Sequence, residues 1–146
     1  MTSELTTVGW REWVSLPQLE IPEIKAKVDT GAKTSCLHAF DLEPYQDNGI
    51  EMIRFLVHPI QKRNDIIKEC HAKVTDKRRV SDSGGHRELR YVITTRLEIG
   101  DMGWDIEMTL TDRDTMLFRM LLGRTAMKNR LNVNPALSYL IGKKPQ

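Results

Sequence analysis

The stretch Ile24-Lys25-Ala26-Lys27-Val28-Asp29-Thr30-Gly31-Ala32 decides how this chain of 146 residues can be interpreted. Residues 24–28 form a strand-like run, which delivers the carboxylate of Asp29 at its end. Gly31 and Ala32 are small, so the backbone can approach that carboxylate closely. A carboxylate held in this way can activate water without a metal or cofactor. Asp29 is therefore the first candidate catalytic residue.

Asp29-Thr30-Gly31 alone is also a common turn sequence, because aspartate and glycine favour turns. A second element, far along the chain, favours catalysis. There an apolar run ends in Leu121-Leu122-Gly123-Arg124 and leads into a helix-like segment from Thr125. The run predicts a core strand followed by a helix cap, and we expect it to lie beside the loop of Asp29 and support it. Together the two elements predict Asp29, Thr30 and Gly31 as a catalytic loop.

The composition is typical of one folded domain. Hydrophobic residues make up 40% of the chain, and no apolar run approaches the length that spans a membrane. We expect one domain over residues 8–142, with flexible ends at 1–7 and 143–146. The first residues lack the basic and apolar regions of a signal peptide, and two cysteines are too few for a disulfide framework. These features predict a cytoplasmic protein with reduced thiols.

Short runs of strand character, bounded by turn residues, predict an all-β domain with one short C-terminal helix. The expected strands cover residues 8–16, 24–28, 51–58, 70–75, 90–99, 104–111 and 136–141, and the helix covers 125–131. The segment 39–48 contains Pro44 and Asn48, and we expect it to be a connection. Residues 81–86 include Gly84 and Gly85 and predict a hairpin tip, because adjacent glycines supply the positive φ values of tight turns.

Positive charge concentrates in one segment of a chain whose formal net charge is +2. From Lys77 to Arg96 there are six basic and two acidic residues, so this segment is locally about +4. A solvated surface loop explains the pattern, and so does a binding site for an acidic peptide. Nucleic-acid binding would want aromatic residues among the basic ones, and Tyr91 stands alone there. We therefore do not expect a nucleic-acid partner.

Four sequence blocks within residues 8–140 are more specific than Asp-Thr-Gly. They are Ile24 to Ser35, Leu37-His38-Ala39, Thr109-Leu110-Thr111-Asp112-Arg113, and Met116 with Phe118 to Arg124. In these blocks the chain resembles the retropepsin-like peptidases of bacteria and archaea long labelled ATP-dependent zinc proteases. The resemblance implies an acid-protease β-barrel with Asp29 as the catalytic carboxylate. From better-studied members it also implies hydrolysis of poly-α-glutamate tails that an ATP-grasp ligase adds to a ribosomal protein.

The zinc and ATP of that label find little support in the residues. Cys36, His38, Cys70 and His71 could supply four ligands, but adjacent Cys70 and His71 would point to opposite faces of a strand. The sequence contains no His-Glu-x-x-His motif and no glycine-rich phosphate loop that ends in Lys-Ser/Thr. We therefore expect no cofactor and no metal. A zinc-dependent peptidase stays open as an alternative.

The chain supplies one Asp-Thr-Gly, whereas aspartic peptidases use two carboxylates in unlike protonation states. We therefore expect a homodimer with Asp29 of each subunit at the twofold axis. Retroviral relatives carry an acidic residue two positions after the motif glycine, and it pairs with the arginine that follows the second glycine. Here that position is Lys33, so Arg124 cannot form this ion pair, and both cations are expected near the cleft.

The hairpin from about Arg79 to Arg90 is expected to act as a flap that covers the substrate and excludes water. An acidic peptide or poly-glutamate chain is the expected substrate. The candidate substrate-binding residues are Ala32, Lys33, Arg79, Gly84, Gly85, Arg87, Arg90 and Arg124. The alternative from a different class is a non-catalytic module with the same fold, which would use its basic flap to hold an acidic partner.

Overall fold

The computed structural model describes residues 5–60, 63, 65–81, 84–85, 87–112 and 117–141. Strands dominate these residues, with one 3-10 turn and one short helix. In chain order the elements are β1 (Thr6–Val8), β2 (Arg11–Leu16), η1 (Pro17–Leu19), β3 (Ile21–Val28), β4 (Ser35–His38), β5 (Phe40–Asp47), β6 (Ile50–Val57), β7 (Lys68–Ser81), β8 (Arg87–Ile99), β9 (Met102–Thr111), β10 (Met120–Leu122), α1 (Arg124–Met127) and β11 (Leu131–Val133). Among the described residues, no helix is long and apolar enough to cross a membrane.

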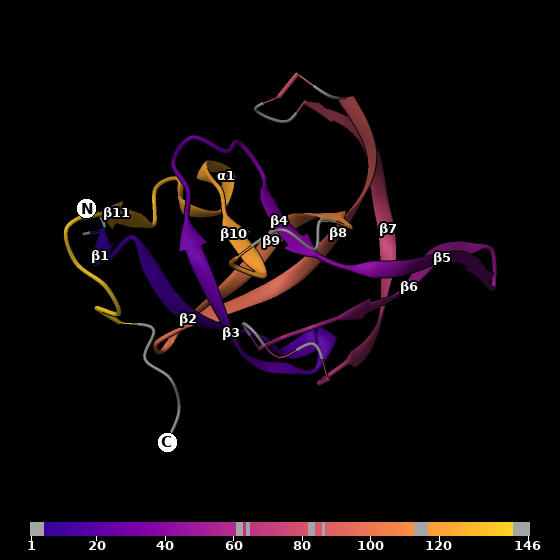
Figure 1. The fold of residues 1–146 in the computed structure, drawn as a ribbon, viewed down its shortest axis with the longest axis horizontal. Coiled ribbons are helices and arrows are strands. Elements are labelled where there is room, and N and C mark those ends of the chain that lie inside the picture. Colours follow the sequence, from indigo (N-terminus) through magenta and orange to yellow (C-terminus); the bar gives the residue numbers. More distant parts are fainter. Residues whose placement is uncertain are drawn as a thin grey trace.

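Nine strands form one sheet in the order β2-β3-β10-β4-β9-β8-β7-β6-β5. Ser15 of β2 also pairs with Glu98 of β8, so the strands from β2 round to β8 close into a ring. Beyond β8 the sheet continues through β7 to the β5–β6 hairpin, which projects from the ring (Figure 1). A separate parallel pair joins β1 to β11. A closed ring of strands with one short helix confirms the all-β prediction.

Buried side chains of the ring, together with those of β6 and β7, form the core. Along β2 buried residues alternate with half-exposed ones, because successive side chains of a strand point to opposite faces. The largest fully buried side chains come from many strands and include Leu16, Ile24, Leu37, Phe55, Leu97, Met108 and Met120. Burying one such side chain contributes about 1.5–3 kcal/mol. Core packing therefore holds together strands that lie far apart in the sequence.

The predicted connection at 39–48 is wrong, because this segment is strand β5. It pairs antiparallel with β6, and Asp47 lies opposite Ile50 at the hairpin end. The turn residues Asn48 and Gly49 take positive φ values of 50° and 81°, as a two-residue hairpin turn requires. Pro44 is tolerated because β5 is the last strand of the sheet, where an N–H can be missing.

Both ends of the chain also differ from the prediction. The expected strand 8–16 is two strands, β1 and β2, interrupted at Gly9 and Trp10. A Cβ on Gly9 would collide with the backbone of Leu137, so the interruption marks a close approach of two chain segments. The expected strand 136–141 is irregular. Its Leu137 carbonyl accepts from the N–H of Trp10 at 2.9 Å instead of joining a strand ladder.

The predicted helix 125–131 is much shorter, since α1 covers Arg124–Met127 only. The helical path ends at Lys128, whose ψ of 127° is extended, and Asn129 with a positive φ of 62° then leads the chain towards β11. The strands predicted at 70–75 and 90–99 are longer than expected. β7 and β8 extend outward beyond the ring, and their register runs up to the pair Ser81 and Arg87. These extended arms are what the sequence interpretation described as a flap.

A fully buried glutamate fixes the C-terminal segment to β2. The carboxylate of Glu12 accepts hydrogen bonds from the N–H groups of Gly9 at 2.7 Å, Leu140 at 2.8 Å and Ile141 at 3.2 Å. A buried charge is costly unless hydrogen bonds replace its water. These three donors do so, and one side chain thereby joins two ends of the described chain.

Replacing Glu12 with alanine should lower the free energy of unfolding by about 3 kcal/mol, because it leaves buried N–H groups without an acceptor. Urea denaturation followed by tryptophan fluorescence measures this. Glu43→Ala is the matched control, since Glu43 is exposed and its ion pair with Arg54 is long, at 3.4 Å. We expect the control to be indistinguishable from the wild type. Equal stability of the two variants would contradict the role assigned to Glu12.

Candidate active site

The loop of Asp29 is held by backbone hydrogen bonds at the end of β3. The N–H of Asp29 donates to the carbonyl of Leu122 at 2.9 Å. Its carboxylate oxygen Oδ1 accepts from the N–H of Gly31, also at 2.9 Å. A Cβ on Gly31 would lie 3.2 Å from that same oxygen, so glycine gives the carboxylate the room it uses. The half-buried carboxylate is therefore oriented by its own loop.

β10 supports this loop from beneath. It pairs in parallel with β3, where Leu122 lies opposite Val28, and antiparallel with β4, where Leu121 lies opposite Cys36. The N–H of Gly123 then donates to the buried hydroxyl of Ser35 at 2.9 Å. A Cβ on Gly123 would lie only 2.6 Å from the carbonyl carbon of Thr34. The predicted supporting strand is therefore present, and its glycine is required by close packing against the loop.

A cavity of about 1310 Å³ opens beside the carboxylate. One part of its lining is basic and comprises Lys27, Lys33, Arg78, Arg79 and Arg90; another is apolar and comprises Trp10, Val80, Leu117, Phe118 and Leu121. The rings of Trp10 and Phe118 pack edge to face with centroids 5.7 Å apart. Among the described residues, Asp29 and Glu107 are the acidic groups of the lining. The cavity thus combines a catalytic candidate with an excess of positive charge.

Two of these charged groups neutralise each other. The guanidinium of Arg78 holds Glu107 through two hydrogen bonds of 3.2 and 2.7 Å, and it also bonds Asp76 at 2.6 Å. These hydrogen bonds, first that with Glu107, raise the pKa of Arg78 above its usual value. Arg78 forms an ion pair with Glu107. Of the two carboxylates in the described cavity lining, Asp29 is therefore the one without such an ion pair.

The extended arms of β7 and β8 include the hairpin that the sequence predicts to act as a flap. In Figure 1 they rise from the ring and curve back above the side that carries the loop after β3. Gly85 takes the positive φ of 81° that a tight tip demands. Asp82, Ser83 and His86, which the predicted tip also includes, lie outside the described residues.

The predicted substrate-binding residues divide into three groups. Ala32, Lys33, Arg79 and Arg90 line the large cavity, as expected. Gly84, Gly85 and Arg87 are exposed on the outer flap and are not part of the cavity lining. Arg124 differs from expectation, because it lines a second cavity of about 480 Å³ together with Thr30. Its guanidinium donates to the carbonyl of Thr30 at 2.9 Å, so it braces the loop of Asp29.

Several cavity residues were missed by the sequence interpretation. These residues come from loops and from β4, β7 and β9, and only the folded chain brings them together: Trp10, Cys36, Arg78, Glu107, Thr109, Thr111 and Phe118. A usable signal existed for Arg78, which belongs to the same basic run as Arg79. Thr109, Thr111 and Phe118 belong to the sequence blocks that carry the family resemblance, although those blocks do not indicate that they line a cavity.

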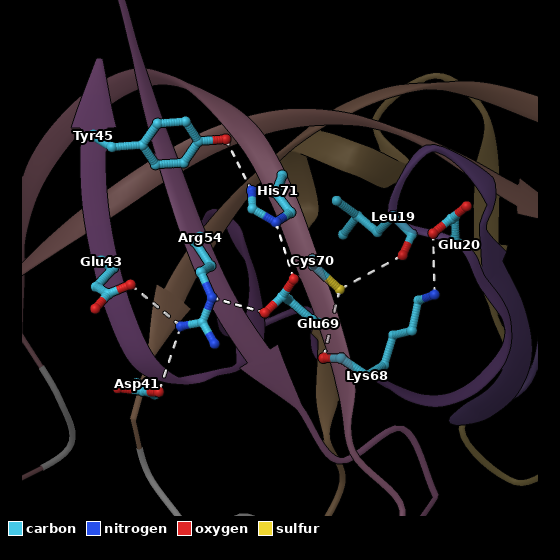
Figure 2. A network of polar contacts seen from close by, with 10 residues as sticks. All are labelled: Leu19, Glu20, Asp41, Glu43, Tyr45, Arg54, Lys68, Glu69, Cys70 and His71. Carbon is cyan, nitrogen blue, oxygen red and sulfur yellow. Dashed lines mark hydrogen bonds and ion pairs between the residues drawn. The ribbon is translucent and has the colours of Figure 1, made fainter. Parts of the chain in front are cut away.

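The four candidate zinc ligands do not converge. The thiol of Cys70 is buried and donates to the carbonyl of Leu19 at 3.5 Å, and burial raises its pKa to about 11. Neighbouring His71 points the other way and bonds Tyr45 at 2.8 Å and Glu69 at 3.3 Å (Figure 2). Within the described part of the chain, no group of three histidine, cysteine, aspartate or glutamate side chains could hold a metal ion.

His38 lies in a different environment again. It is buried at the end of β4, and loss of hydration lowers its pKa below the usual value. Its ring lies in a stack with those of Phe40 and His58. A histidine held in this way packs within the closed ring of strands.

The family model named RimB-like, described as retropepsin-like aspartic endopeptidase RimB, matches residues 7–144. The chain belongs to this family. A probable alpha-L-glutamate ligase of Shewanella pealeana is 43% identical over 144 residues, which is 99% of this chain and 31% of that protein. A probable alpha-L-glutamate ligase of Desulfotalea psychrophila is 47% identical over 93% of this chain and 29% of its own length. The chain thus spans under a third of these curated relatives.

The fold also occurs in a crystal structure. A Legionella pneumophila protein of unknown function is similar with a TM-score of 0.80 and 27% identity, and the match covers 94% of this chain and 98% of that one. The similarity extends over nearly the whole of both chains. The overall fold is therefore shared with that solved protein.

Ser35→Ala tests how the loop of Asp29 is supported. The change leaves the buried N–H of Gly123 without its acceptor, so the free energy of unfolding should fall by about 1–3 kcal/mol. Amide hydrogen exchange should also become faster at Gly123. Ser15→Ala is the control, because its hydroxyl bond to Ile21 is long, at 3.4 Å, and lies outside the loop. Unchanged protection at Gly123 would show that the serine does not support the loop.

Proposed function

We propose that this protein is an aspartic endopeptidase that acts as a homodimer and hydrolyses peptide bonds in glutamate-rich chains. The observation that carries the proposal is the carboxylate of Asp29, oriented by Gly31 at the edge of a cavity with an excess of cations. Membership of a family described as aspartic endopeptidases supports the reaction type. The cytoplasm is the proposed location.

Two copies of Asp29 would share the work. One carboxylate takes a proton from water, and the water oxygen attacks the carbonyl carbon of the scissile bond. The other carboxylate, protonated, donates a hydrogen bond to the carbonyl oxygen. The C–N bond then breaks, and the nitrogen leaves with a proton as an amine. Two carboxyl groups held close together cannot both be ionised, because their negative charges repel each other. One of the pair therefore stays protonated while the other is ionised.

The surface near Thr30 supports the dimer. The second cavity lies there and has an apolar part made by Met127, Leu131 and Val133. It adjoins the catalytic loop, so a second subunit that covered it would bring its own loop close. Such an arrangement places the same surface of both subunits in contact, as a twofold axis requires.

The charges of the cavity and flap support an acidic substrate. Arg79 and Arg87 are exposed on the flap, where they would attract a poly-glutamate chain over a distance that salt shortens. The curated relatives, in which this region is less than a third of the protein, are named for ligation of glutamate. Their name favours glutamate chains as the material that this domain processes.

Asp29→Asn should lower cleavage of an oligo-glutamate peptide by at least about a hundredfold, because the amide cannot accept the proton from water. Mass spectrometry of the products measures this. Asp105→Asn, a change at an exposed position of β9, is the control and should retain activity. Peptide binding without cleavage by the wild type would favour the non-catalytic binding module.

Chelators should leave the peptidase activity intact. A loss of activity that added zinc restores would favour the metallopeptidase.

Subunit mixing tests the dimer. Wild type and Asp29→Asn, unfolded together in equal amounts and refolded, should show about a quarter of the activity of the same total amount of wild type, because random pairing makes only that share of dimers with two carboxylates. Independent active monomers would give about half. The mixture needs a total concentration at which sedimentation shows the wild type to be dimeric. A value of one half would contradict a shared active site.

A further inference from the structure

Arg90 differs from the other cations of the cavity in its burial. Its side chain is only 8% exposed, whereas Lys33 and Arg79 are exposed and the side chain of Arg78 is 36% exposed. Arg78 is also neutralised by the carboxylates of Glu107 and Asp76. An exposed cation is hydrated and screened, while a cation that has lost its water gains much more from an anion that reaches it.

Three strands fix the direction of this guanidinium. Its Nε donates to Oε2 of Glu88 at 2.9 Å, and that carboxylate accepts in turn from the hydroxyl of Thr111 at 3.1 Å. Its Nη1 points to the sulfur of Cys36 at 3.8 Å. Glu88 and Arg90 belong to β8, Thr111 to β9 and Cys36 to β4. The side chain is therefore held in place before any substrate arrives.

Most of the hydrogen-bonding capacity of Arg90 is left for a ligand. A guanidinium carries five N–H donors in a planar fork. Among the described residues, its acceptors are the carboxylate of Glu88 and the weakly accepting sulfur of Cys36. The side chain lines the same cavity as Asp29. A preorganised fork with spare donors favours a planar carboxylate, which it can bind through two parallel hydrogen bonds.

We infer that Arg90 binds one carboxylate of the bound peptide and is the residue that selects glutamate over its neutral analogue. The inference rests on the proposed function and adds a distinct role to it. Arg79 and Arg87 attract the chain at long range, whereas Arg90 recognises a single position. The carboxylate can come from a glutamate side chain or from the C-terminus of the peptide, and both have the same planar chemistry. Glu88 is a positioning residue.

The test combines enzyme variants with a peptide series. Oligo-glutamate peptides carry one Glu→Gln change at successive positions, with either a free or an amidated C-terminus. For the wild type, we expect a glutamine at one position to lower kcat/KM by about tenfold to a hundredfold, since the spare N–H donors of the buried guanidinium then lack a carboxylate to bind. Arg90→Gln should lower kcat/KM on the all-glutamate peptide by a similar factor and should remove the discrimination at that position.

Matched variants separate recognition from general attraction. Arg79→Gln should keep the discrimination and mainly weaken the dependence of kcat/KM on salt. Glu88→Gln should reduce the discrimination without abolishing it, because Arg90 keeps its charge but loses its anchor. Sensitivity to C-terminal amidation, without sensitivity to any side chain, would assign the carboxylate to the C-terminus. The inference would be overturned if Arg90→Gln discriminated as strongly as the wild type between glutamate and glutamine at every position and between free and amidated C-termini.

A binding measurement keeps this inference separate from the proposed reaction. Titration calorimetry on the Asp29→Asn protein, with and without Arg90→Gln, compares all-glutamate and single-glutamine peptides without any cleavage. If the wild type cleaves nothing, the proposed function fails, while a loss of selective binding in the Arg90 variant still supports recognition. Equal peptide selectivity of both proteins overturns it. Should Arg90→Gln fail to fold, Arg90→Lys retains the charge, loses the fork and should bind with reduced discrimination.

Discussion

The candidate site depends on the position of β10 between β3 and β4. β3 carries Asp29 outward, β4 carries the chain back into the ring, and β10 pairs with both. The carbonyl of Leu122 accepts from the N–H of Asp29, and the hydroxyl of Ser35 accepts from the N–H of Gly123. Residues almost a hundred positions apart thus fix one loop. Because these partners are backbone groups and a buried hydroxyl, the position of the carboxylate is set by the fold itself.

Sequence reasoning found this arrangement because its signals are local and chemically specific. Each motif, Asp29-Thr30-Gly31 and Leu121-Leu122-Gly123, ends in a glycine. In both cases the packing explains the glycine, because a Cβ there would come too close to a neighbouring atom. The reasoning failed where tertiary contacts override local preference. Pro44 indicated a connection, yet the edge of the sheet accepts a proline in β5. Residues 136–141 have strand-like composition, yet Glu12 and the backbone at Trp10 and Arg11 take their hydrogen bonds.

Charge has two different uses at the two ends of β7, since residues 78–81 line the cavity and Glu69 pairs with Arg54. On the cavity side, basic residues are left in excess over the acidic ones. On the outer face of β5, β6 and β7, cations are paired, as Arg54 bonds Glu69 at 2.8 Å and lies near Asp41 and Glu43 (Figure 2). The hydrogen bond from Arg54 lowers the pKa of Glu69. Sequence counts of charge cannot separate these faces, because the pairing partners come from different strands.

The hydrogen bonds that join Glu12 to the C-terminal segment limit how far the domain can be shortened at that end. In the curated relatives a matching region is part of a much longer protein, so an experimenter who wishes to excise it must choose where to cut. The N–H groups of Leu140 and Ile141 complete the coordination of a fully buried carboxylate. A cut before these positions would remove only the side chains of an irregular segment and none of the fully buried core. It would nevertheless remove the backbone donors of Leu140 and Ile141 from a buried carboxylate, so the excised domain should retain the counterparts of residues up to 141.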